Sequence, residues 1–109
     1  MTYEEYYRRL YHEFNQRYFA GELEEDIEVI IEPCGKCDDL YGYVNHFRPF
    51  MGHEITIDDE MAVLHDKWAR IILLHEMIHI KLHPYGYHGK PFYDEFLRLA
   101  NMGAYKTLI

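Results

Sequence analysis

His75, Glu76 and His79 form the pattern His-Glu-x-x-His within one short stretch of the chain. On a helix, residues four apart lie one turn apart on the same face, so both imidazoles can bind one metal ion. Glu76 is offset from His75 by about 100° around the helix axis, which places its carboxylate beside the metal rather than on it. Such a carboxylate can take a proton from a metal-bound water whose pKa the ion lowers to ~7. The pattern therefore predicts a catalytic zinc site with Glu76 as the general base.

The residues around this pattern are apolar almost all the way round the expected helix, from Trp68 to Leu82. A helix of this kind belongs in a protein interior. The alternative is a buried helix with two ordinary core histidines. Each buried polar group left without a partner costs roughly 1–3 kcal/mol, and a charge costs more. A zinc ion would remove that cost for all three residues together, so burial favours the metal.

A catalytic zinc usually has three protein ligands, so a third ligand must lie outside the pattern. Metzincin proteases and YbeY-type nucleases have a histidine six residues after the second one, but here that position is Tyr85. His83 continues the helix face, yet it lies roughly 12 Å along the axis from His75. His88 follows a turn that contains proline and glycine, which lets the chain reverse over the metal. We therefore predict that His75, His79 and His88 bind zinc, and favour His88 over His83.

The other histidines and the two cysteines show no ligand spacing. A C-x-x-C pair is half of a zinc ribbon, and the sequence has no second pair to complete it. We expect the cysteine pair to lie in a turn and to be incidental rather than functional, with a redox or auxiliary metal role left open, and the histidines to be surface or supporting residues. These residues are His12, His46, His53, His65, Cys34 and Cys37.

The composition limits the classes of function. The chain has 109 residues, 49% of them hydrophobic, which predicts one folded domain spanning 1–109. Its formal net charge of −8 disfavours nucleic acid as a partner. The N-terminus lacks the apolar segment of a signal peptide, and no apolar run is longer than that of Ile71–Leu74, which is too short to span a membrane. We expect a cytoplasmic, monomeric protein with no membrane association.

Two helices and three strands are expected around the metal-binding helix. Aromatic residues at helical spacing predict a helix from Thr2 to Ala20, with Thr2 as its cap and Gly21 as its stop. Composition and alternation predict strands at 27–31, 40–47 and 53–57. Asp58 and Asp59 can cap the helix that follows, although the helix itself is expected to begin near Asp66. It should end near residue 83, and a last helix should start near Pro91 and close at 101–103.

The combination of H-E-M-I-H at 75–79 with H-G-K-P-F at 88–92 resembles the SprT-like domain, a minimal zincin core also found in Spartan-type proteases of DNA–protein crosslinks. The likeness extends to F-N-x-x-Y-F-x-G-x-L at 14–23, L-Y-G-Y at 40–43 and E-I-T-I at 54–57. It implies an α+β fold with an N-terminal helix, a small three-stranded sheet, the active-site helix and a closing helix. It also implies zinc on His75, His79 and His88, with Glu76 as general base and acid.

The resemblance further implies a protein or peptide substrate that pairs with the edge strand beside the cleft, for which His53–Ile57 is the candidate. The resemblance also implies an association with DNA, which the net charge of −8 disfavours. Arg48, Tyr85 and Tyr87 are candidates to stabilise the oxyanion. The predicted function is a zinc metallopeptidase. The alternative is a non-catalytic zinc-binding domain that acts as a binding or regulatory module.

Overall fold

The structure, a computed structural model, describes residues 1–34, 41–45, 53–83 and 88–106. Its elements are four helices and three strands, which confirms the expected α+β class with a small three-stranded sheet. In chain order they are α1 (Tyr3–Tyr18), β1 (Ile27–Glu32), β2 (Gly42–Asn45), β3 (His53–Asp58), α2 (Asp59–Leu64), α3 (Asp66–Leu82) and α4 (Lys90–Asn101). No helix in the described ranges combines the length and apolar character that crossing a bilayer requires.

The sheet has the strand order β1-β3-β2, so β3 is its central strand. It pairs with β1 in parallel, with Ile27 opposite His53, and with β2 antiparallel, with Gly42 opposite Ile57. The prediction that His53–Ile57 is an edge strand is therefore wrong. Alternation of apolar residues indicates which face of a strand is buried, but it does not tell how many neighbours the strand has. Among the described residues, the outer strands are β1 and β2.

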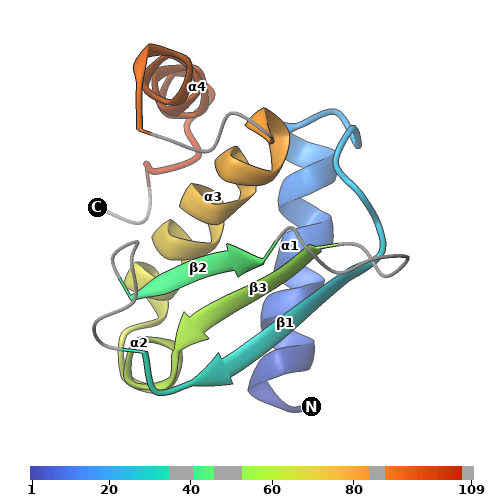
Figure 1. Ribbon diagram of the computed structural model, residues 1–109, viewed down its shortest axis with the longest axis vertical. Coiled ribbons are helices and arrows are strands. Elements are labelled where there is room, and N and C mark those ends of the chain that lie inside the picture. The colour runs from blue at the N-terminus through green and yellow to red at the C-terminus, as the bar shows by residue number, and fades with distance from the viewer. Residues whose placement is uncertain (35–40, 46–52, 84–87, 107–109) are drawn as a thin grey trace.

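Helices α1 and α3 pack against the sheet and against each other (Figure 1). The core between these layers is formed by fully buried side chains such as Tyr7, Tyr11, Ile55, Leu73 and Met77. The expected cap of α1 is confirmed, because the Thr2 hydroxyl accepts a hydrogen bond from the Glu5 N–H at 3.1 Å. The helix ends two residues earlier than expected, and Gly21 follows in the left-handed region at φ +72°.

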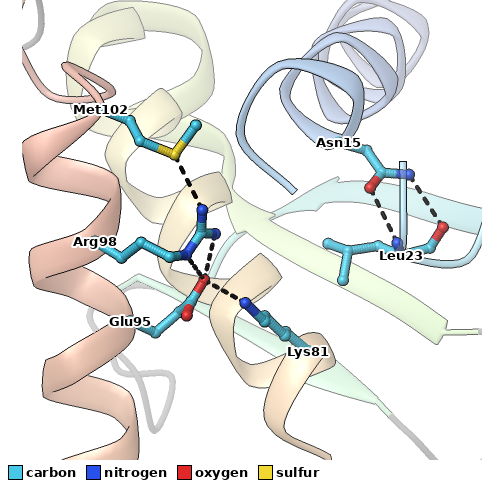
Figure 2. Close-up of polar contacts among 6 residues, drawn as sticks. All are labelled: Asn15, Leu23, Lys81, Glu95, Arg98 and Met102. Carbon is cyan, nitrogen blue, oxygen red and sulfur yellow. Dashed lines mark hydrogen bonds and ion pairs between the residues drawn. The ribbon is translucent and has the colours of Figure 1, made fainter. Parts of the chain in front are cut away.

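The connection from α1 to β1 is held by Asn15, a fully buried residue. Its side-chain amide donates to the Leu23 carbonyl and accepts from the Leu23 N–H, both at 3.0 Å (Figure 2). The Asn15 side chain thus provides hydrogen bonds to both backbone groups of the buried Leu23. Each of these groups would otherwise be unsatisfied, at a cost of roughly 1–3 kcal/mol. This pair fixes where the chain leaves α1 and enters the sheet.

The short helix α2 has no counterpart among the expected elements. Asp58 does act as an N-cap, since its carboxylate accepts from the Met61 N–H at 3.3 Å, but the helix it caps ends at Leu64. Helix α3 then begins at Asp66, as expected, and ends at Leu82. The Tyr7 hydroxyl of α1 connects the end of α2 with the start of α3. It donates to the Ala62 carbonyl and to the Asp66 carboxylate, with both distances 2.9 Å.

Candidate metal centre

Three imidazoles meet where α3 and the start of α4 face each other. His75 and His79 lie one turn apart on α3, and His88 lies just before α4. The His88 Nε2 atom is 3.0 Å from His79 Nε2 and 3.2 Å from His75 Nε2. Among the described residues these three form a group that could hold a metal ion, with ligand atoms all within 4.8 Å of one another. His79 is buried, His75 half-buried and His88 exposed, so the group opens to solvent on the side of His88.

The donor set fits a tetrahedral metal ion. Two nitrogens bound to zinc at 2.0–2.1 Å in tetrahedral geometry lie about 3.3 Å apart, close to the two short distances at His88. Hydrogen bonding explains the cluster less well. An imidazole nitrogen carries one in-plane N–H or one lone pair, so His88 Nε2 cannot make well-directed bonds to both neighbours. A cation held between the rings would accept a lone pair from each of them.

Glu76 is fully buried between α3 and the outer strand β2. A Cβ atom added to Gly42 would lie 3.6 Å from the Glu76 carboxylate and only 2.5 Å from the Ile72 side chain. Glycine at position 42 therefore allows β2 to approach α3 closely. A glycine within a strand is a signal for such an approach, but the sequence did not indicate which element would lie opposite.

Phe92 supports the three imidazoles from the first turn of α4. Its ring centroid lies 4.7 Å from that of His75 and 4.8 Å from those of His79 and His88. Phe92 lies in the helix that the sequence predicts to start near Pro91. Its contact with all three imidazoles is a role that helical spacing could not indicate, because two of the three histidines are on another helix.

An ion network centred on the buried Glu95 carboxylate fixes α4 against α3 (Figure 2). Glu95 of α4 accepts from Lys81 of α3 at 2.9 Å and from the Arg98 Nε at 2.7 Å, with a further bond from the Arg98 guanidinium. Burial alone would raise the pKa of Glu95, but the hydrogen bonds and charges of Arg98 and Lys81 outweigh it and hold the pKa below its usual value. The Glu95 carboxylate is thus ionised where it holds the two helices together. Its partner Lys81 lies two residues after His79 on α3, and Glu95 itself lies three residues after Phe92 on α4.

His83 does not join the cluster. It is the C-terminal cap of α3, where the helix was expected to end, and its ring packs edge-on against that of His53, with 5.7 Å between the ring centroids. His53 is 9% exposed, with its Nε2 atom 3.6 Å from a Glu24 carboxylate oxygen. Burial lowers the pKa of His53; the Glu24 carboxylate opposes that shift, and His83 adds to it.

The remaining predicted residues are placed as follows. Cys34 donates its backbone N–H to Asp58 at 2.9 Å. His12 lies 2.8 Å from a Glu25 carboxylate oxygen on the surface side of α1. His65 caps α3. Five of the residues singled out in the sequence lie outside the described residues: the oxyanion candidates Arg48, Tyr85 and Tyr87, and also Cys37 and His46.

Comparison of the chain with protein-family models, with curated proteins and with solved structures finds no match.

Proposed function

We propose that this protein is a SprT-like zinc metallopeptidase in which His75, His79 and His88 bind the metal. The observation that supports this most directly is the convergence of three imidazole nitrogens at the spacing of a tetrahedral site. Three histidines leave a fourth coordination position open, as catalytic zinc sites do, whereas structural sites have four protein ligands. When bound, zinc would supply Lewis-acid activation of the scissile carbonyl and of a water.

Glu76 is the proposed general base and acid. It follows His75 directly on α3 and is buried, so its carboxylate is held in place by the surrounding core rather than by solvent. It would take the proton from the attacking water and pass it to the leaving amine. A purely structural zinc site has no need of a buried carboxylate at this position.

The proposed substrate is an extended segment of a protein or peptide that pairs with β2. This strand is antiparallel to β3, and Gly42 at its start is adjacent to Glu76. An outer strand offers backbone donors and acceptors to an added strand. A peptide bound there would run past the carboxylate and the three histidines.

The test compares four proteins: wild type, Glu76→Gln, His88→Ala and His83→Ala. Wild type and Glu76→Gln should each bind one zinc, but kcat/KM for peptide cleavage should fall at least about 100-fold in Glu76→Gln because the general base is lost. His88→Ala should lose zinc. His83→Ala, which removes an equivalent exposed imidazole outside the cluster, should keep both zinc and activity.

Unchanged cleavage by Glu76→Gln would refute the mechanism, and zinc loss in His83→Ala rather than His88→Ala would refute the ligand set. Firmly bound zinc with no cleavage across a broad panel of peptides and proteins would support the alternative, a non-catalytic zinc-binding module.

A further inference from the structure

An apolar pocket with a cavity volume of about 370 Å³ opens next to the three histidines. Its walls come from Tyr41 ahead of β2, Met61 of α2, and Trp68, Ile71 and Ile72 of α3, and it reaches His75. The volume is in the range of small-ligand sites, which are mostly apolar with a few polar groups. His75 belongs both to this pocket and to the metal cluster, so a ligand on the metal has direct access to the pocket.

Two features of the pocket walls are unusual for residues that only fill space. Trp68 is the only tryptophan of the chain, and it is 61% exposed. Tyr41 has a left-handed backbone at φ +70°, which is rare for a bulky residue and costs of order 1–3 kcal/mol. Its carbonyl is held by the Asp58 N–H at 2.7 Å. This backbone geometry comes directly before Gly42, where β2 begins.

We propose that this pocket binds a large apolar side chain of the substrate, aromatic or long aliphatic, and thereby selects the peptide bond that is cleaved. The inference rests on the proposed function and adds its substrate class. A peptide paired with β2 passes Tyr41 and Gly42, and a side chain that points towards α3 at that place enters the pocket beside His75. Trp68 and Ile71 are then specificity-determining residues.

Binding can be measured without catalysis, because Trp68 is the only tryptophan and lies in the pocket wall. Two probes share a hydroxamate, a zinc-binding group. Acetohydroxamic acid has no tail, and 3-phenylpropanohydroxamic acid carries a phenyl group. The phenyl probe should bind the zinc-loaded protein at least about tenfold tighter, because it buries an aromatic ring, and it alone should change the fluorescence of Trp68.

Ile71→Phe narrows the pocket and leaves the fluorophore in place. In this variant the affinity ratio of the two probes should fall to near one, with zinc content unchanged. Val63→Phe is the matched control, since Val63 is a half-exposed β-branched residue on α2 that borders a different hollow. It should keep the wild-type ratio. In peptide cleavage, wild type should favour a phenylalanine over an alanine beside the scissile bond by about tenfold or more, and Ile71→Phe should reverse that order.

Equal affinities for the two probes in zinc-loaded wild type would overturn the pocket assignment. The same holds if the ratio of the two affinities is equal in Ile71→Phe and Val63→Phe. Either result, with zinc bound and peptides cleaved, leaves the proposed function intact. Absence of zinc from the wild-type protein would overturn both. Zinc binding and phenyl selectivity without cleavage would overturn the peptidase and, with it, the assignment of the pocket to a substrate side chain.

Discussion

Replacing Gly42 with alanine should disturb both the fold and the site. The added Cβ would lie 2.5 Å from the Ile72 Cγ2 atom and 3.0 Å from the Thr56 carbonyl oxygen. Carbon atoms in contact prefer about 3.5–4.0 Å, so β2 and α3 must separate by roughly 1 Å. Ile72 cannot turn aside easily, because a β-branched side chain on a helix has one strongly preferred rotamer. Overpacking of this kind costs about 1–3 kcal/mol.

The cost can be isolated by a double-mutant cycle measured as free energy of unfolding in urea. Ile72→Ala alone should destabilise by about 2–5 kcal/mol through the cavity it leaves. Combined with Gly42→Ala, it should destabilise less than the sum of the two single changes, by about 1–3 kcal/mol, because the clashing methyl group is gone. Thermal unfolding should show Gly42→Ala as a fall in Tm of roughly 4–8 °C for each kcal/mol.

Gly103→Ala is the control. Gly103 has φ +83°, and an added Cβ meets nothing within 4 Å, so its cost comes from backbone strain alone and should be additive with Ile72→Ala. Additive energies for the Gly42 and Ile72 pair, or a Gly42→Ala protein as stable as wild type, would refute the close-approach explanation. Because Glu76 lies at the same contact, Gly42→Ala should also lower peptide cleavage, by as much as about 100-fold for a 1 Å displacement.

Two further predictions concern charge and pH. Glu95→Gln should lower the free energy of unfolding by about 1.5–3 kcal/mol at neutral pH, the usual range for hydrogen bonds to charged groups, and a urea titration measures it. Since the pKa of Glu95 is lowered by folding, this stabilisation is present above about pH 4.3 and is lost as the pH falls through the folded value. A variant whose Tm falls with acid as steeply as that of wild type would contradict it. For His53, whose pKa folding also lowers, the unfolded state binds the proton first, so stability should fall as the pH drops below about 6.5. His53→Asn should reduce that fall in a Tm–pH profile; because Glu24 and His83 are the same in both proteins, the difference from wild type reports on His53. A variant profile identical to that of wild type would refute this account of His53.

Local rules predicted most of the secondary structure. The Thr2 cap, the start of α3 at Asp66, its end before Pro84 and the proline at the start of α4 are all set by residues within a few positions of each boundary. Helix α2 was missed because six residues give too short a window for periodicity, and Val63 and Leu64 on it are exposed. Its cap, Asp58, was visible, but a cap does not tell how long a helix will be.

In the candidate site, too, local sequence predicted some features and long-range contacts decided others. The pairing of His75 with His79 follows from helix geometry alone, and the distance along the axis disfavoured His83. The sequence favoured His88 as the third ligand, and the structure brings its ring to these two residues. The edge strand was assigned wrongly because strand order depends on contacts between distant segments: β1 and β3 pair in parallel although residues 33–52 lie between them in the chain.

The sequence by itself determined the chemistry that this protein can offer: two imidazoles and a carboxylate on one helix, a third imidazole after a turn, and an acidic domain with an α+β pattern. Only the tertiary structure decided that β3 is central, that Gly42 admits β2 to the side of Glu76, that Phe92 lies against all three imidazoles and that an apolar pocket adjoins His75. Helix spacing and capping are local and are encoded within a few residues. Strand order, close backbone approach and pocket shape depend on side chains far apart in the chain, whose contacts arise only when the layers pack.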